Sequence, residues 1–281
     1  MNRFPRFKSA AVLAMAAAIL FSPARAASDA DVAAGRDLVK RYSDAVIGVE
    51  LVVIMKVKMG DREQPPREQR IEVNGTVISS SGLTVTSLAQ VDPQTIVSGM
   101  RGVELVNTDF KEVKLRKADG KEVPARFVLK DGDLDLAFMA PVVEPDAPKP
   151  EFSSYVKLED AAEGGLLSTY FFVTRAPKVL QRVPVARAVD VLGIVEKPRR
   201  FYLMTDSALG APMFDAKGRL LGITLQNFSS GRSTGLVVLP AADIAEIAKQ
   251  ATTLQMQPKA PDAEKPPTVD IPPAPPPPPA K

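Results

Sequence analysis

The spacing of its apolar, β-branched segments is the feature that most constrains the fold of this chain. About six short segments of this kind lie between residues 45 and 143, and about six more lie between residues 165 and 239, with turn residues between them and little helix. Connections this short join antiparallel strands, because a parallel pair needs a crossover of a dozen or more residues. The sequence therefore predicts an all-β fold of two six-stranded antiparallel β-barrels.

The segments outside the two groups of strands define the predicted domains. A Pro-bounded stretch, EPDAPKP, covers residues 144–150 and predicts a linker. Two aspartates begin a short amphipathic helix before the first group, and apolar positions at helical spacing predict a terminal helix over residues 241–255. We expect an N-terminal barrel with its leading helix over residues 28–143, and a C-terminal barrel with its terminal helix over residues 151–257.

A long connection interrupts the first group of strands. Asp92-Pro93 ends one strand pattern, and strand signals resume only at Val113. Long loops without regular structure are more often functional than accidental. We therefore predict an irregular insertion over residues 94–110, and we regard it as a candidate contact surface for a partner protein.

Residues 1–26 have the composition of a secretory signal peptide. A basic start precedes an apolar run of about 12 residues, and the segment ends in Ala24-Arg25-Ala26. The run is too short for a membrane span, which needs about 20 apolar residues. The sequence thus predicts a secreted protein, located in the periplasm of a bacterium, with no membrane span after the signal is removed.

Removal of this segment makes the protein nearly neutral. Four of the 36 basic residues lie in the segment, which leaves 32 basic against 33 acidic residues. A near-neutral chain gives no electrostatic reason to expect a nucleic acid as its partner. Cysteine is absent from the sequence, so a hydrophobic core rather than disulfides has to stabilise the fold.

Residues 258–281 form a tail of unusual composition. The tail contains eleven prolines and ends in PPAPPPPPAK. Such a segment cannot bury a core and populates the extended polyproline II conformation, so we predict that it is disordered. It could bind an aromatic-lined groove of a partner or serve as a spacer, and the sequence leaves both alternatives open.

The clearest local motif is TDSALGAPMFDAKGRLLGI at residues 205–223. Two apolar runs flank the turn DAKG, in which Gly218 takes the tight position, and this pattern predicts a β-hairpin. Two earlier blocks are GTVISSSGLTVTSLA at residues 75–89 and DGDLDLA at residues 131–137, and GLVVLP follows at residues 235–240. In this order, the blocks resemble those of trypsin-like serine proteases of the HtrA type.

This resemblance implies a trypsin-like fold that has lost its catalytic triad. It places Ala89 at the position of the histidine, Asp135 at that of the aspartate and Leu209 at that of the serine. A triad needs a hydroxyl nucleophile, an imidazole base and a carboxylate, and the chain contains no histidine anywhere. The loop from Asp206 to Pro212 is also about five residues shorter than the family's, which predicts the loss of the oxyanion hole.

We therefore expect a pseudoprotease rather than an enzyme, with no cofactor. Its expected partner is another protein, bound through the former cleft, through the insertion at residues 94–110 or through the Pro-rich tail. Residues 258–281 leave no room for the PDZ domain that HtrA-type proteases carry, so that domain is not expected either.

A serine hydrolase with a non-standard nucleophile is the alternative. Ser207 lies two residues before Leu209, and a serine can use a desolvated lysine as its base. The candidate base, Lys217, lies in the turn of the hairpin, where solvent would keep it protonated.

Two charged clusters are the remaining candidates. Asp131, Asp133 and Asp135 alternate as in a calcium loop, but the glycine and glutamate that the EF-hand pattern requires are not in place. We therefore predict a turn and no metal site, with Asp135 accepting hydrogen bonds from backbone N–H groups of its loop. The basic residues within 197–200 are predicted to be part of a solvated loop.

Overall fold

The computed structural model of the protein describes residues 28–92, 94, 103–143, 148, 150–229 and 232–256. The predicted signal peptide (1–26) and the predicted tail (258–281) lie outside the described residues, and so does most of the predicted linker (144–150). None of the described helices has the length and apolarity that a membrane crossing requires.

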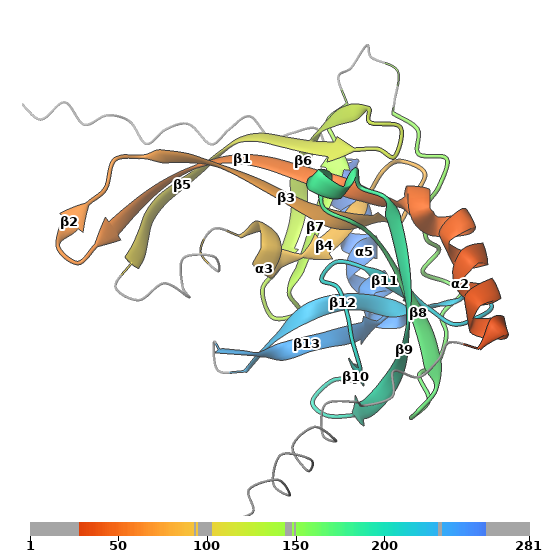
Figure 1. Cartoon of the computed structure of the whole chain (residues 1–281). Coiled ribbons are helices and arrows are strands. Elements are labelled where there is room, and N and C mark those ends of the chain that lie inside the picture. Colours follow the sequence, from red (N-terminus) through yellow and green to blue (C-terminus); the bar gives the residue numbers. More distant parts are fainter. Residues whose placement is uncertain are drawn as a thin grey trace, which may run out of the picture.

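Six of the described strands close the N-terminal barrel. They pair in the order β1-β3-β4-β7-β6-β5, and β5 pairs back with β1, antiparallel throughout (Figure 1). A two-residue strand, β2, pairs with the far end of β1. The bounds are β1 (Val46–Met59), β2 (Arg62–Glu63), β3 (Arg67–Val77), β4 (Thr84–Ser87), β5 (Val103–Arg116), β6 (Glu122–Asp131) and β7 (Leu136–Pro141).

Six further described strands close the C-terminal barrel, in the order β10-β13-β12-β11-β8-β9. The predicted hairpin is formed by β11 and β12, and Gly218 in its turn has a φ of 88°. The prediction of two six-stranded antiparallel barrels is therefore confirmed. The bounds are β8 (Thr169–Arg175), β9 (Pro184–Val195), β10 (Phe201–Met204), β11 (Pro212–Phe214), β12 (Leu220–Ser229) and β13 (Arg232–Pro240).

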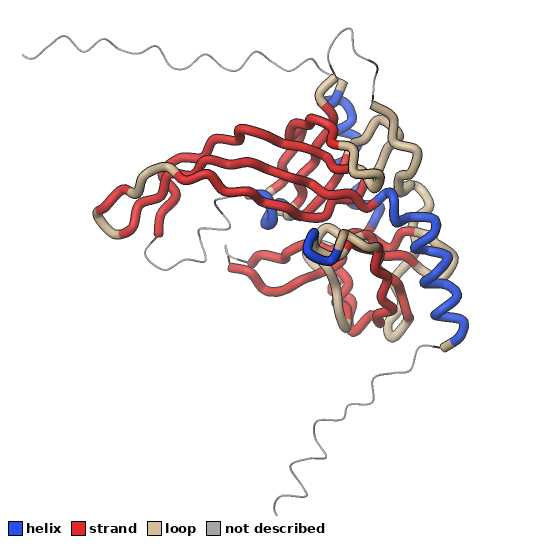
Figure 2. The backbone as a smooth tube through the Cα atoms, turned by 45° about the horizontal axis from the view of Figure 1, so that its top comes forward, coloured by secondary structure: helices blue, strands red, loops and turns tan. Residues whose placement is uncertain are grey.

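Strands β1, β3 and β5 continue beyond the first barrel as a projecting arm (Figures 1 and 2). This arm corrects the prediction that residues 94–110 are irregular, because residues 103–110 belong to β5. Register shifts between Val52 and Val53 and between Lys56 and Val57 break the alternation of side chains that a regular strand would show in the sequence. The rest of the predicted insertion, apart from residue 94, lies outside the described residues.

The second group of predicted strands includes an apolar, β-branched stretch over residues 179–195, which is not a strand at its start. Residues Lys178–Leu180 form a short 3₁₀ helix, η2, and β9 begins only at Pro184. The two residues that follow η2, Gln181 and Arg182, have φ values of 58° and 52°. Left-handed residues cannot continue a strand, and this explains why an apolar, β-branched sequence turns here.

The leading helix α2 (Asp29–Tyr42) packs on the C-terminal barrel, although it precedes the N-terminal barrel in the chain. A capping box between Ser28 and Asp31 begins the helix. At its other end, the Tyr42 ring stacks on Phe214 with centroids 4.3 Å apart, and Tyr42 Oη donates a hydrogen bond to the Gly218 carbonyl at 2.9 Å. A short 3₁₀ turn, η1 (Ser43–Ala45), leads from the helix into β1.

The terminal helix α5 (Ala241–Gln255) joins both barrels. Its predicted apolar face is confirmed, since Ile244, Ala248 and Ala251 are buried. The end of the helix reaches the first barrel, where Arg126 Nη2 donates to the Leu254 carbonyl at 3.1 Å. A further short helix, α3 (Leu88–Val91), follows β4 and contains Ala89, which the sequence resemblance predicts to stand in place of the histidine.

Candidate functional site

Asp135 is the buried centre of the candidate site. The turn from Asp131 leads from β6 to β7, and Asp131 Oδ1 accepts hydrogen bonds from the N–H groups of Asp133 and Leu134, both at 3.0 Å. Asp135 ends this turn with a φ of 59°, and only 2% of the residue is exposed. The turn therefore buries the carboxylate of Asp135 and uses the carboxylate of Asp131 for its own hydrogen bonds.

Three donors from three segments meet the Asp135 carboxylate. Ser87 Oγ donates to Oδ2 at 2.5 Å, the Ala89 N–H donates to Oδ1 at 2.7 Å, and the Gln226 N–H donates to Oδ2 at 2.7 Å. The prediction that backbone N–H groups of its own loop bind Asp135 is wrong, because the N–H donors belong to α3 and β12. Because β12 belongs to the second barrel, this carboxylate links the two barrels.

The pKa of Asp135 reflects two opposing effects. Burial raises the pKa above its ordinary value, because a desolvated carboxylate is costly to ionise. The hydrogen bonds from Ser87 and from the N–H groups of Gln226 and Ala89 favour the ionised form and offset part of this rise. The net direction is upward.

We expect the stability that Asp135 contributes to decrease as pH rises. Because its pKa is higher in the folded chain than in the unfolded chain, the contribution is complete below the unfolded value of about 3.8 and is lost as pH rises through the folded pKa. The measurement is the free energy of unfolding between about pH 3.5 and pH 7, for the natural protein and for the neutral variant Asp135→Asn. The free energy of unfolding of the natural protein minus that of the variant should fall as pH rises. A rise would show that the hydrogen bonds lower the pKa of Asp135 by more than burial raises it.

The aspartates of the calcium-like pattern do not form a common site. Asp131 serves its own turn, whereas Asp135 points to donors on other segments. No group of three or more His, Cys, Asp or Glu side chains that could hold a metal ion occurs among the described residues.

The loop that carries Leu209 is packed against the first barrel. Thr76 Oγ1 donates a hydrogen bond to the Gly210 carbonyl at 2.9 Å, and Gly210 has a φ of 74°. A Cβ atom on Gly210 would lie 2.6 Å from both the Asn74 carbonyl oxygen and Thr86 Oγ1, so only glycine allows this approach. The loop of Leu209, the residue predicted to stand in place of the serine, thus lies beside β3 and β4. Strand β4 leads to Ala89.

Ser207 is held by its neighbour in this loop. Its N–H donates to Asp206 Oδ1 at 2.8 Å, and the other oxygen of Asp206 pairs with Arg187. Ser207 Oγ makes no hydrogen bond to a lysine of the described chain, and Lys217 lies beyond the other end of β11. The structure therefore does not bring together the pair that an alternative hydrolase would need.

The comparison with solved structures decides the fold. No family model and no curated protein matches the sequence. The serine endoprotease from Yersinia pestis aligns with a TM-score of 0.50 and 15% identity, covering 78% of this chain and 66% of that protein. This chain has the trypsin-like fold. The trypsin-like fold class predicted from the sequence is thereby confirmed.

Other solved structures that match are also proteases by name. The MamO protease domain from Magnetospirillum magneticum has a TM-score of 0.45 and 18% identity, covering 73% of this chain and 95% of that domain. The HtrA-type protease AlgW with a decapeptide has a TM-score of 0.49 and 16% identity, covering 78% of this chain and 68% of that protein. HtrA-type proteases are thus among the structural neighbours of this trypsin-like chain.

Sequence reasoning missed several contacts of this trypsin-like site. Ser87 ends β4 whereas Ala89 lies in α3, so no spacing within one element indicated that both contact Asp135. Gln226 comes from the other barrel, and no local pattern points to it. In the loop at residues 197–200, Arg200 Nε donates to Glu196 Oε2 at 3.0 Å, as a solvated loop allows.

Proposed function

We propose that this chain is a trypsin-like pseudoprotease that does not cleave peptide bonds and acts as a protein-binding or scaffold subunit. The observation that carries this proposal is the absence of histidine from all 281 residues. Without an imidazole, no group can accept the proton of a nucleophilic serine in the way a triad requires. Alanine at position 89 and leucine at position 209 remove the base and the nucleophile together.

The geometry around the Ser207 N–H also supports the loss of peptide cleavage, because this group would be needed to bind the oxyanion. In a trypsin-like mechanism the oxyanion binds the N–H of the nucleophile and the N–H of the residue two positions earlier, here Ser207. The Ser207 N–H already donates to the Asp206 carboxylate. A carboxylate at this position would also repel a developing oxyanion. Asp135, which would orient a histidine, instead links the two barrels.

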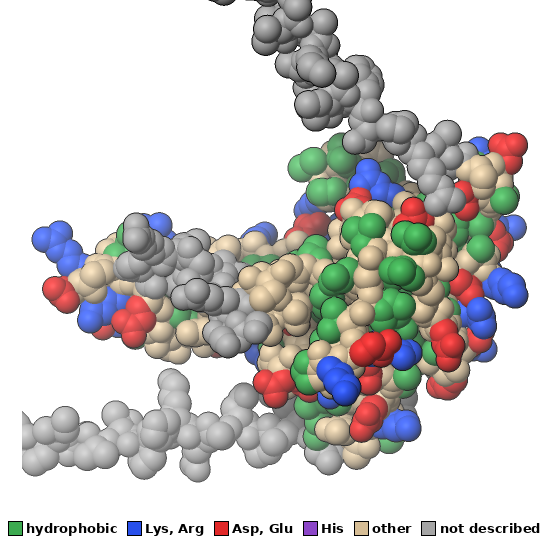
Figure 3. Space-filling view, turned by 90° about the horizontal axis from the view of Figure 1, so that it is seen from below, with side chains coloured by type: hydrophobic (Ala, Val, Ile, Leu, Met, Phe, Trp, Pro, Cys, Tyr) green, Lys and Arg blue, Asp and Glu red, His purple; other side chains and the backbone are tan. Residues whose placement is uncertain are grey.

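An exposed hydrophobic surface supports a binding role. Exposed leucines of the C-terminal barrel include Leu167 at 72% and Leu192 at 57%, together with Leu166 and Leu203. Figure 3 shows hydrophobic side chains gathered on this barrel, with charged side chains around them. Large exposed apolar patches are uncommon on monomeric soluble proteins and mark interaction sites. We propose this patch as a contact surface in addition to the former cleft, residues 94–110 and the tail.

The test is hydrolysis by the purified protein lacking residues 1–26, which we propose to be a signal peptide that directs secretion to a bacterial periplasm. We expect no cleavage of unfolded casein and no labelling by a fluorophosphonate probe, because both need an activated serine. Active trypsin is the positive control. Cleavage or labelling that disappears in Ser207→Ala would contradict the proposal and support the alternative hydrolase.

The binding role has its own test. Affinity capture from a periplasmic extract, with the chain ending at residue 257 or at residue 281, would show whether the Pro-rich tail is needed to hold a partner. The variant Leu192→Asp tests the exposed leucines in the same way. Capture that is equal in all forms would exclude both surfaces.

A further inference from the structure

A cavity between the two barrels lies apart from the triad-equivalent positions. Its volume is about 330 Å³, and its walls come from the start of β1, from the turn at residues 117–120 and from the segment at residues 178–182. This volume is within the range of ligand sites in proteins, about 300 to 1,000 Å³. We call it the interbarrel cavity.

The walls of the interbarrel cavity are predominantly basic. Asp119 is the acidic residue of the lining, and its Oδ1 accepts the N–H of Lys121 at 2.9 Å. The basic residues of the lining are Arg116, Lys117, Arg175, Lys178 and Arg182.

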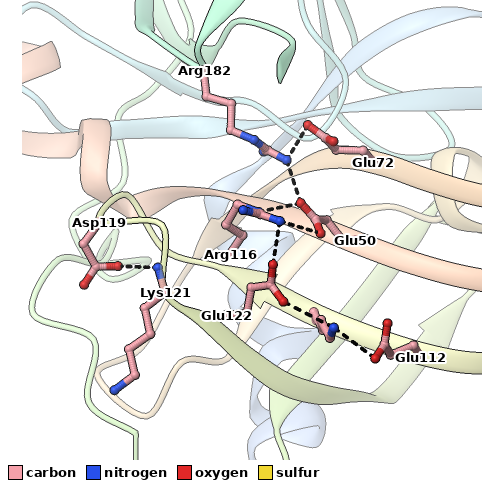
Figure 4. A network of polar contacts seen from close by, with 9 residues as sticks. Glu50, Glu72, Glu112, Arg116, Asp119, Lys121, Glu122 and Arg182 are labelled. Carbon is pink, nitrogen blue, oxygen red and sulfur yellow. Dashed lines mark hydrogen bonds and ion pairs between the residues drawn. The ribbon is translucent and has the colours of Figure 1, made fainter. Parts of the chain in front are cut away.

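All three arginines of the lining pair with acids outside it. Arg116 pairs with Glu50 and Glu122, and Arg182 pairs with Glu50 and Glu72 (Figure 4). Arg175 Nη2 pairs with Asp44 at 3.1 Å. Arg116 donates to Glu50 at 2.5 and 3.0 Å, and Arg182 Nη2 donates to the same carboxylate at 2.9 Å and also pairs with Glu72. The hydrogen bond from Arg116 lowers the pKa of Glu50, so this shared acid stays ionised. These arginines form a rigid frame, and each keeps N–H groups that the ion pairs do not use.

Neither lysine of the lining forms an ion pair with a described residue, although the charge of Lys178 contributes to lowering the pKa of Glu50. Lys117 Nζ donates to the Glu151 carbonyl at 3.1 Å, which is a neutral partner. Lys178 forms neither an ion pair nor a hydrogen bond with any described residue. A carboxylate is the planar anion that guanidinium and ammonium groups bind well. Because the three arginines of the lining are paired with carboxylates, the ammonium groups of Lys117 and Lys178 are the part of the interbarrel cavity that is complementary to an anionic group.

An apolar tip lies directly beside Lys178. Val179 is 87% exposed and Leu180 is 59% exposed, both in η2. The next two residues have left-handed φ values. The loop is held at Arg182, by the ion pairs of its side chain and by a hydrogen bond of 3.2 Å from Arg175 Nη1 to its carbonyl. Strained backbone that the surrounding structure holds in place is typical of sites that present side chains to a ligand.

We propose that the interbarrel cavity and this tip form a docking site for an acidic peptide segment of a partner protein. A carboxylate of the segment enters the cavity beside Lys117 and Lys178, and a neighbouring apolar side chain covers Val179 and Leu180. A free inorganic anion could contact only the basic part of the site. A peptide could also cover the apolar tip, so the site favours a peptide. This site does not depend on whether the cleft is catalytically inactive.

The test uses the full chain and fluorescein-labelled peptides. The probe GDLVDG should raise fluorescence anisotropy on binding, whereas GNLVNG, without carboxylates, and GDGGDG, without apolar side chains, should bind at least about tenfold more weakly. Lys178→Ala and Val179→Asp should each weaken GDLVDG by about tenfold or more, since each removes one half of the site. Lys217→Ala, which changes another lysine in an exposed turn, is the matched control and should leave binding unchanged.

Several outcomes would overturn the proposal. These are no binding of GDLVDG, equal binding of GDLVDG and GNLVNG, or unchanged binding to the double variant Lys117→Ala/Lys178→Ala. Displacement of the peptide by equimolar inorganic phosphate, with no effect of Val179→Asp, would indicate an adventitious ion only. Circular dichroism verifies that each variant is folded, and the casein assay, run in parallel, reports on hydrolysis independently of this site.

Discussion

Replacing Gly210 with alanine is expected to lower the free energy of unfolding by about 3 kcal/mol. Two costs add at this position. An alanine at a φ of 74° is in the left-handed region, and its Cβ would lie 2.6 Å from the Asn74 carbonyl oxygen and from Thr86 Oγ1. A backbone oxygen in a strand cannot move aside cheaply, so the loop that carries Leu209 would have to leave the first barrel.

The measurement is chemical denaturation of the natural protein and of the variant. Gly60→Ala is a matched control, because Gly60 has a φ of 59° but a Cβ added there would meet no atom within 4 Å. The control should lose only the backbone contribution, about 1 kcal/mol. Equal losses at the two positions would show that packing against the first barrel contributes nothing.

Replacing Asp135 with alanine is expected to lower the free energy of unfolding by about 4 kcal/mol. The change leaves the N–H groups of Ala89 and Gln226 without their acceptor in a buried position. The hydroxyl of Ser87 can rotate to another partner, so its loss is smaller. Alanine is also less suited than aspartate to the φ of 59° at this residue.

Two further variants separate these contributions. Asp133→Ala changes a neighbouring exposed aspartate of the same turn and should alter the free energy of unfolding by less than about 0.5 kcal/mol. Asp135→Asn keeps one acceptor oxygen but turns an N–H₂ group toward a donor, and we expect a loss of about 2 kcal/mol. If Asp135→Ala were no more harmful than Asp133→Ala, the carboxylate would not link the two barrels.

The barrels could be predicted from the sequence because several pairs of neighbouring strands are joined by a short turn that is visible in the sequence. Strand spacing and turn residues identify antiparallel neighbours, and the block that contains Asp135 could be aligned from a few residues. The contacts of Asp135 could not be predicted fully, because the Gln226 N–H comes from a strand 91 positions later in the chain. The network around Glu50 was missed for the same reason, since Arg182 comes from the other barrel.

Errors of element type have a different cause. Residues 103–110 looked irregular because two register shifts hide the alternation of β5. Val179 looked like part of a strand because β-branched residues favour strands, but left-handed Gln181 and Arg182 redirect the chain. In both cases, contacts with distant parts of the chain decide the local structure. A local sequence pattern carries no information about such contacts.

The terminal helices carry a consequence for the order in which the chain is assembled. Helix α2 is synthesised first but has its packing surface on the barrel that is completed last, around Phe171 and Phe214. Helix α5 emerges at the end and reaches back to Arg126 and Ser81 in the earlier half. A nascent chain therefore cannot bury Leu38 and Tyr42 of α2 against the C-terminal barrel until Phe214 has been synthesised.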